Sequence, residues 1–280
     1  MSPLKKKYPE RVIAIILCAG KGTRIKDTFP STPKSLIKIP TLQDISILDH
    51  LISNLLDLDI NKIEIIVGHL GFLIKEHIDN LKKGDKKVYH KVYVIDSRQE
   101  YQKGSFFSFL SFAKDLPKYS NRDLFLIFPG DTIFSKELLG YIFHRISKES
   151  TLFEKYPSIF YKDIKRKNLR AAYLPSVSTL KLYSKNEENY LKEIVHIDVK
   201  GKNGSRIKQI IPIVTFPYDV IRDIFKNIDE MNVNSIKDLI NFLIKSKRQN
   251  FKVYKLSSKF QFYDIDSKYD LLNFERKSGQ

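Results

Sequence analysis

The sequence predicts an α/β protein with a doubly wound, mostly parallel sheet, to which the second half of the chain adds a mixed-sheet lid. Two features indicate this class. Over the first 135 residues, short apolar runs alternate with segments of helical periodicity, and beyond them the alternation loosens into shorter strand-like runs. We expect one domain over residues 1–280, divided into halves at 11–135 and 136–280.

The elements of the first half follow from local patterns. Apolar residues recur with the 3.6-residue period of a helix over 45–58 and 71–81, and a glycine opens a third helix over 104–114. A short extended segment is expected at 35–39, before Pro40. Buried strands are predicted at 12–18, 62–67, 92–95 and 123–128.

The second half contains more strands than helices. Helices are predicted at 135–146, 218–229 and 235–246, and a terminal helix follows residue 266. The glycine-rich turn at 200–204 predicts a hairpin between strands at 195–199 and 206–211. Further strands are expected at 159–162, 179–183, 213–216, 252–256 and 261–265.

Composition limits the protein class. The 42% apolar and 29% charged residues are ordinary for a globular protein, and no apolar run has the 18 or so residues of a membrane span. The Lys-rich start lacks a signal-peptide core, so we expect a cytoplasmic protein. A single cysteine, Cys18, excludes an internal disulfide and a multi-cysteine metal site. The net charge of +17 comes from basic residues, mostly lysines, that are scattered over the whole chain. We interpret these lysines first as solvated surface residues and only second as a binding patch.

The segment after the first strand has the composition of a phosphate-binding loop. Gly20 and Gly22 allow a sharp turn that directs several backbone N–H groups at one point, which suits an anion. Arg24 adds a guanidinium that can contact phosphate oxygens in pairs, and Lys34 adds a compact charge. The glycine spacing fits neither a P-loop nor a dinucleotide-binding loop.

Two carboxylates follow predicted strands further along the chain. Asp131 comes just after the fourth strand, and Asp266 just after a late strand. Mg²⁺ is bound by one or two carboxylates while phosphates and water complete its octahedron. This order of motifs, with A-G-x-G-T-R and then P-K-x-L eight residues later, resembles the nucleotidyltransferases that make NDP-sugars and CDP-alcohols, a family with a Rossmann-like fold.

The resemblance implies a set of site residues. In the family, the residues matching Asp131 and Asp266 hold the catalytic Mg²⁺, and we prefer Asp266 over Asp264 as the ligand. Arg24, Lys34 and Asp131 are expected to be catalytic. The acceptor contacts are open, with Lys181 and Lys185 as weak candidates. The expected nucleotide-binding residues are Leu17, Ala19, Gly20, Gly22, Thr23, Arg24, Lys34, Gln99, Gly104 and Ser105.

The resemblance also implies an activity. Residues 103–110 are more similar to the cytidylyltransferase branch, whose members act on phosphocholine or inositol 1-phosphate, so CTP is the favoured nucleotide. We expect Mg²⁺-dependent transfer of CMP to a phosphorylated alcohol or sugar, by residues 11–135 as the nucleotide-binding half and 136–280 as the acceptor-binding half. A sugar-1-phosphate enzyme using UTP, dTTP or GTP is the first alternative. A basic nucleic-acid-binding protein and a non-catalytic regulatory homologue are more remote ones, and no nucleic-acid partner is expected.

Overall fold

The computed structural model describes residues 11–165, 176–185, 188–198 and 206–278. Four parallel strands form the first half of its main sheet, in the order β5-β4-β1-β6. They are β1 (Arg11–Cys18), β4 (Lys62–Val67), β5 (Val92–Asp96) and β6 (Asp123–Pro129). These are the four strands predicted from the first apolar runs. The side chains of β1, β4 and β6 are mostly buried because helices cover both faces, whereas only Val92 is buried in the edge strand β5.

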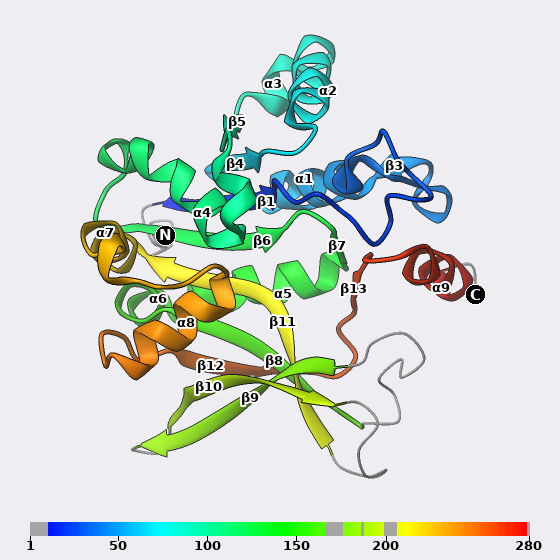
Figure 1. Cartoon of the computed structure of the whole chain (residues 1–280). Coiled ribbons are helices and arrows are strands. Elements are labelled where there is room, and N and C mark those ends of the chain that lie inside the picture. Colours follow the sequence, from blue (N-terminus) through cyan, green and yellow to red (C-terminus); the bar gives the residue numbers. More distant parts are fainter. Residues whose placement is uncertain (1–10, 166–175, 186–187, 199–205, 279–280) are drawn as a thin grey trace, which may run out of the picture.

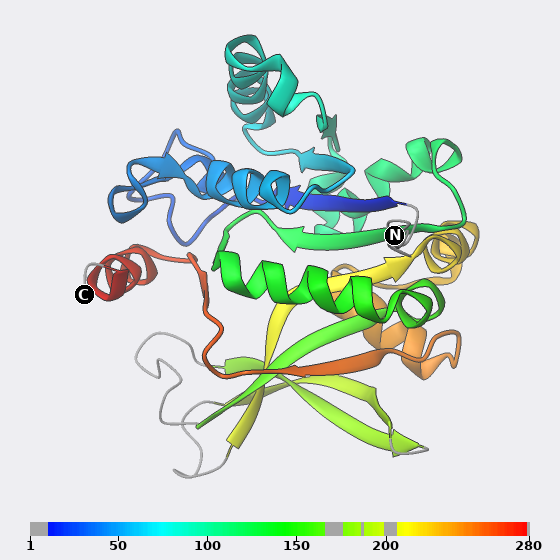
Figure 2. The same ribbon diagram turned by 180° about the vertical axis from the view of Figure 1, so that it is seen from behind.

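Helices on both faces confirm the doubly wound class (Figures 1 and 2). One face packs against α1 (Ile47–Asp57), α2 (Gly71–Gly84), α5 (Lys136–Lys148) and α6 (Ser150–Lys155). The other packs against α4 (Ser105–Leu110), η4 (Ser111–Lys118), α7 (Tyr218–Lys226) and α8 (Ile236–Lys245). The short α3 (Lys86–Tyr89) follows α2. In the described part of the chain, no helix is both long and apolar enough to cross a membrane.

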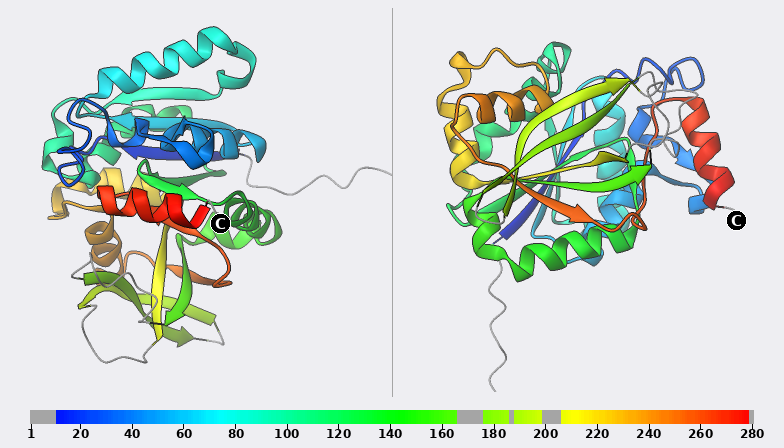
Figure 3. Two further views of the ribbon diagram at one scale, coloured as in Figure 1. Left: turned by 90° about the vertical axis from the view of Figure 1, so that its right-hand side faces the viewer. Right: turned by 90° about the horizontal axis from the view of Figure 1, so that it is seen from below.

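The second half continues the same sheet from the free edge of β6. Its strands follow in the order β11-β8-β12-β10-β9, with mixed directions. They are β8 (Ser158–Lys165), β9 (Ser176–Lys185), β10 (Glu188–Asp198), β11 (Arg206–Pro217) and β12 (Lys252–Leu256). Since β9 also pairs with β11 through Thr179 and Gln209, this half curls back on itself (Figure 3).

The hairpin predicted between 195–199 and 206–211 is wrong. In the described residues, β10 pairs with β9 and β12, whereas β11 pairs with β6, β8 and β9. The long antiparallel register of β9 with β10 provides the hairpin instead, from Ser176 opposite Asp198 to Lys185 opposite Glu188. The predicted turn at 200–204 lies outside the described residues. A local turn signal therefore did not decide which strands pair.

Other elements differ in their bounds. The extended segment expected at 35–39 is a turn of 3₁₀ helix, η1 (Lys34–Leu36), followed by the short strand β2 (Lys38–Ile39). The helix expected over 104–114 is α4 followed by η4, and η3 (Glu100–Lys103) precedes it. The strand expected at 213–216 is the end of β11, which a bulge at residues 211–214 divides. The end of the helix expected at 218–229 is the separate turn η6 (Ile228–Glu230).

A smaller unit lies at the carboxyl ends of the parallel strands. It joins β3 (Ile45–Ser46), β7 (Thr132–Phe134), β13 (Phe262–Asp264) and α9 (Lys268–Ser278), with η2 (Pro40–Leu42) beside them. Its own apolar cluster includes Ile25 and Ile37 from the segment after β1, and Leu271 and Phe274 from α9. This packing connects the glycine-rich loop to the C-terminal helix.

Candidate active site

The ends of two neighbouring strands place the glycine-rich loop beside Asp131. Strands β1 and β6 are parallel neighbours, so both of their carboxyl ends reach the same edge of the sheet. The amide of Gly130 donates to the carbonyl of Leu17 at 3.0 Å. A Cβ on Gly130 would lie 2.2 Å from the sulfur of Cys18, so only glycine allows the chain to pass this close to β1. Burial raises the pKa of Cys18 to about 12, which leaves a structural thiol and no nucleophile.

A second pair of strands brings the late carboxylate to the same place. Strand β13 pairs with β7 so that Asp264 lies opposite Thr132, and the amide of Ile265 donates to the carbonyl of Asp131 at 3.0 Å. The next residue, Asp266, therefore lies beside Asp131. Asp270 accepts hydrogen bonds from the amide of Ser267 at 2.8 Å and from its hydroxyl at 2.7 Å, and so stabilises the start of α9.

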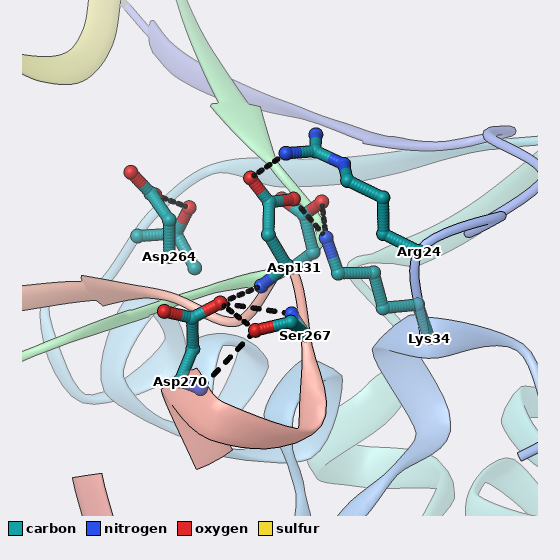
Figure 4. Close-up of polar contacts among 8 residues, drawn as sticks. Arg24, Lys34, Asp131, Asp264, Ser267 and Asp270 are labelled. Atoms are coloured by element: carbon teal, nitrogen blue, oxygen red, sulfur yellow. Dashed lines mark hydrogen bonds and ion pairs between the residues drawn. The ribbon is translucent and has the colours of Figure 1, made fainter. Parts of the chain in front are cut away.

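Lys34 bridges the two carboxylates (Figure 4). Its Nζ lies 2.6 Å from Asp131 Oδ2 and 2.6 Å from Asp266 Oδ1. Arg24 Nη1 lies 3.0 Å from the other oxygen of Asp266, and the Arg24 side chain is 67% exposed whereas that of Lys34 is only 11% exposed. Burial by itself would lower the pKa of Lys34, but the two carboxylates raise it above the ordinary value. Lys34 is therefore an ammonium at neutral pH.

A third carboxylate, Asp264, faces the same cavity. It accepts a hydrogen bond from Thr132 Oγ1 at 2.6 Å, and the residue is exposed where it lines that cavity. Desolvation together with the nearby charges of Asp131 and Asp266 raises the pKa of Asp264 to about 6, although the Thr132 hydroxyl and Lys34 oppose the shift. Asp264 thus adds a third carboxylate near Asp131 and Asp266, whose charges are already partly neutralised by Lys34 and Arg24.

The donor set fits Mg²⁺. In the part of the chain that the structure describes, no three His, Cys, Asp or Glu side chains form a cluster that could hold a metal ion alone. Asp131 and Asp266 nevertheless already share one cation, the ammonium of Lys34. Since Mg²⁺ needs only one or two carboxylates when substrate phosphates supply further oxygens, these two residues could hold it.

Two adjoining cavities meet at these charges. The smaller, of about 180 Å³, lies over the glycine-rich loop and is lined by Gly20, Gly22, Thr23, Lys34 and Asp131 among others. Gly22 has φ of +59°, and its carbonyl accepts from the amide of Ile25 at 3.1 Å, which forms the turn expected of the loop. The larger cleft, of about 760 Å³, opens between the parallel half of the sheet and the curled half. The small cavity suits phosphate groups, and the large one has room for a base and an acceptor.

The model of the nucleotidyl transferase family matches residues 13–158, just over half of the chain. The chain belongs to the nucleotidyl transferase family. It is 29% identical to a UTP–glucose-1-phosphate uridylyltransferase from Haloferax volcanii over 125 residues, 45% of each chain. It is 36% identical to the bifunctional protein GlmU of Methanococcus maripaludis over 131 residues, 46% of this chain and 27% of the relative. The matches thus span less than half the length of these curated relatives.

Solved structures of related fold extend the comparison to nearly the whole chain. CTP:phosphocholine cytidylyltransferase from Streptococcus pneumoniae has a TM-score of 0.62 at 19% identity, covering 95% of this chain and 99% of the other. The inositol-1-phosphate CTP transferase from T. maritima has a TM-score of 0.65 at 15% identity, with coverages of 95% and 94%. A UDP-glucose pyrophosphorylase complexed with UDP-glucose has a TM-score of 0.67 at 14% identity, with coverages of 95% and 98%. They confirm the predicted nucleotidyltransferase fold.

The nucleotide-binding residues predicted for this nucleotidyl transferase are only partly gathered in the structure. Leu17, Ala19, Gly20, Arg24 and Ser105 line the large cleft. Gln99 does not line the cleft, and its side-chain oxygen accepts a hydrogen bond from the side-chain amide of Gln102. Gly104 has φ of +127°, and a Cβ there would lie 2.2 Å from the carbonyl oxygen of Asn234, so its glycine serves a close backbone contact.

Tyr101 was not among the predicted nucleotide-binding residues, and it lines the cleft beside Ser105 and Ser108. A Cβ on Gly68 would lie 2.7 Å from the Tyr101 ring, so the ring packs directly on the glycine backbone at the end of β4. In the sequence, Gly68 directly follows the second strand and Tyr101 lies close to Gln99, but no local pattern connects the two. Their contact depends on β4 and β5 being neighbours.

The weak acceptor candidates lie outside the cleft lining. Lys181 on β9 forms an exposed ion pair with Glu193 at 3.2 Å, and Lys185 is the exposed last residue of β9. The curled half instead presents Ser178, His196 and Lys237 to the cleft. Sequence reasoning missed these three because it paired β10 with the wrong strand.

Proposed function

We propose that this nucleotidyl transferase catalyses the Mg²⁺-dependent transfer of a nucleoside monophosphate to a phosphate monoester, with CTP as the preferred donor. The acceptor would be a phosphorylated alcohol or sugar, and the products an NDP-alcohol or NDP-sugar and pyrophosphate. The observation that carries this proposal is the bridge of Lys34 between Asp131 and Asp266, directly beside a glycine-rich loop and a cleft large enough for both substrates.

The proposed transfer reaction requires neutralisation of phosphate charge but no general base. A phosphate monoester has its second pKa near 6, so at pH 7 its oxygen is mostly ionised and needs no general base. That oxygen forms the new bond to the α-phosphorus as the bond from the α-phosphorus to the pyrophosphate oxygen breaks. Asp131 and Asp266 would hold Mg²⁺, which would supply positive charge to neutralise the phosphates.

The protein's own cations complete this arrangement. Lys34 remains an ammonium, and we assign it to the α-phosphate, where it stabilises charge in the transition state. Arg24 is largely exposed on the loop side and can turn from Asp266 to the departing pyrophosphate, together with the loop N–H groups. The loop, Lys34 and both carboxylates meet in the small cavity, so one triphosphate could contact them all.

The preference for CTP rests on the similarity of residues 103–110 to the cytidylyltransferase branch. Two of the solved relatives with this fold, the phosphocholine and inositol-1-phosphate enzymes, use CTP. A UTP-dependent sugar-1-phosphate enzyme is the second candidate, because the Haloferax volcanii relative is a uridylyltransferase at 29% identity. The remaining alternatives, dTTP and GTP, belong to the same reaction.

A pyrophosphate-release assay with Mg²⁺ tests the function. Each of CTP, UTP, dTTP, GTP and ATP is combined with sugar 1-phosphates, inositol 1-phosphate, phosphocholine and phosphoethanolamine. We expect release that needs both substrates, falls about 100- to 1000-fold in Asp131→Ala, and persists in Asp79→Ala, a control on the exposed face of α2. Failure of folded protein to bind any of the nucleotides would refute the proposal.

A further inference from the structure

The wall of the large cleft that the curled half provides carries a short chain of polar side chains. Lys237 Nζ on α8 lies 2.7 Å from His196 Nε2 on β10. His196 Nδ1 lies 3.2 Å from the hydroxyl oxygen of Ser178 on β9. All three residues line the cleft, and none of them belongs to the phosphate end described above.

The hydrogen bonds of this chain run in one direction. An ammonium can only donate, so His196 Nε2 must be the acceptor and the imidazole proton must lie on Nδ1. Nδ1 then donates to Ser178, whose own hydroxyl proton remains available to another group. Lys237 likewise keeps two further N–H groups. The wall therefore offers hydrogen-bond donors, which favours a ligand that carries hydrogen-bond acceptors.

The charge of the wall is positive. Among the side chains that the structure describes, no carboxylate forms an ion pair with Lys237, whereas at the phosphate end Lys34 and Arg24 are paired with carboxylates. Lys237 is half-buried between Ile236 and Ile240, which also line the cleft. An unpaired ammonium beside apolar side chains favours an anionic ligand.

A cationic ligand lacks support on this wall. Recognition of a quaternary ammonium requires aromatic faces around the cation. In the described part of β9, β10, β11 and α8, no Phe, Tyr or Trp lines the cleft. Lys237 would in addition repel a positive headgroup.

We propose that Lys237, held by His196 and Ser178, selects an acceptor that carries an acidic group, a carboxylate or second phosphate, at the end remote from its reacting phosphate. This inference rests on the proposed transferase function, since it assigns the reacting phosphate to the end of Lys34. It disfavours phosphocholine and places an acidic phosphomonoester first among acceptors.

Isothermal titration calorimetry of the full chain with matched probes tests the proposal. Glucose 1-phosphate and glucuronic acid 1-phosphate differ only in a carboxylate, glucose 1,6-bisphosphate replaces it with a phosphate, and phosphocholine carries a cation. Titrations are run with and without Mg²⁺ and the α,β-methylene analogue of CTP, which cannot release pyrophosphate. We expect at least one acidic probe to bind about 10- to 100-fold more tightly than glucose 1-phosphate, and phosphocholine to bind most weakly. The stronger of the two acidic probes identifies the group.

Variants assign the preference to Lys237. Lys237→Met should abolish the difference between acidic and neutral probes, and Lys237→Glu should reverse it. Lys245→Met is the control, because Lys245 is an exposed lysine on the same helix, α8, outside the cleft lining. Equal affinities in the wild type, no binding of any probe, or a preference that survives both Lys237 variants would each overturn the proposal. Pyrophosphate release in the assay above decides the transferase function separately.

Discussion

Replacing Lys34 by methionine tests how much the ammonium of Lys34 stabilises the folded protein. The variant keeps the length of the side chain but removes the ammonium that lies 2.6 Å from both Asp131 and Asp266. The raised pKa of Lys34 means that its stabilising effect is fully present below the ordinary value of 10.5 and is lost only as the pH rises through the raised value. A measurement at pH 7.5 therefore senses the whole effect.

The expected loss follows from the two ion pairs. Breaking a buried ion pair by removing one partner costs about 3–5 kcal/mol. The Asp131 and Asp266 side chains are 37% and 28% exposed, so water weakens the repulsion that remains between them. We expect the free energy of unfolding to fall by about 2–3 kcal/mol after this discount. Urea denaturation in EDTA at low salt measures it, with Lys38→Met as the control on the exposed side of β2.

Added Mg²⁺ should then favour the variant. On the proposed assignment, the ammonium and Mg²⁺ compete for Asp131 and Asp266, so Mg²⁺ should bind the Lys34→Met protein more tightly and stabilise it by about 1.4 kcal/mol more for each tenfold gain in affinity. Turnover should still fall about 100- to 1000-fold, because the metal does not replace the contact that we propose between Lys34 and the α-phosphate. A variant as stable as Lys38→Met in EDTA, or an equal Mg²⁺ response in both proteins, would refute this reasoning.

Three further outcomes follow from single contacts. Gly104→Ala places a Cβ 2.2 Å from the carbonyl oxygen of Asn234 at φ of +127°, so the free energy of unfolding in urea should fall by about 2–4 kcal/mol. Gly84→Ala, whose new Cβ meets open space, is the control, and equal stability of the two variants would contradict the contact. Gly68→Ala must displace the Tyr101 ring and should weaken CTP binding by roughly tenfold in calorimetry, as the loss of one stacking face does; an unchanged affinity would remove Tyr101 from the nucleotide site. The pKa of Asp264 is raised to about 6, so ionisation of this carboxyl destabilises the folded protein as the pH rises through that value. The melting temperature of Asp264→Asn in EDTA, relative to that of the wild type, should therefore rise from pH 5 to pH 8. A difference in melting temperature that stays constant over this range would contradict the raised pKa.

The parallel half of the fold and the catalytic end of the site could be predicted from sequence. The burial of β1 follows from its apolar run at 12–18, and the strand at 62–67 follows from its β-branched residues, both typical of strands covered on two faces. Once the strands are parallel, the residues that follow them must gather at one edge. Local patterns thus sufficed to bring the glycine-rich loop and Asp131 together, whereas Asp266, which follows β13 in a separate antiparallel pair with β7, was joined to them only by the family resemblance.

The curled half could not be predicted in the same way, because its strand pairings are long-range choices. The strands β9 and β10 are half-exposed and carry many polar residues, so their apolar pattern does not specify a partner. The glycine-rich turn at 200–204 suggested the wrong one. Register there depends on contacts with β12 and α8, which lie about 50 residues further along the chain.

This contrast explains why the acceptor was the weakest part of the sequence interpretation. The three residues of the cleft wall are separated by 18 and 41 positions, and only the pairing of β9 with β10 and the packing of α8 on β10 bring them together. Asn241 on α8 holds that packing, donating to the carbonyl of Ile194 at 3.0 Å and accepting from its amide at 2.8 Å. Of the groups proposed for the chemistry, the glycine-rich loop and Asp131 follow parallel strands, and Asp266 reaches them through the antiparallel pair of β13 and β7. The groups proposed for acceptor choice lie on β9, β10 and α8. Under the proposed assignment, acceptor choice depends on β9, β10 and α8, whereas the glycine-rich loop and Asp131 follow β1 and β6, so a change in the first set need not alter the second.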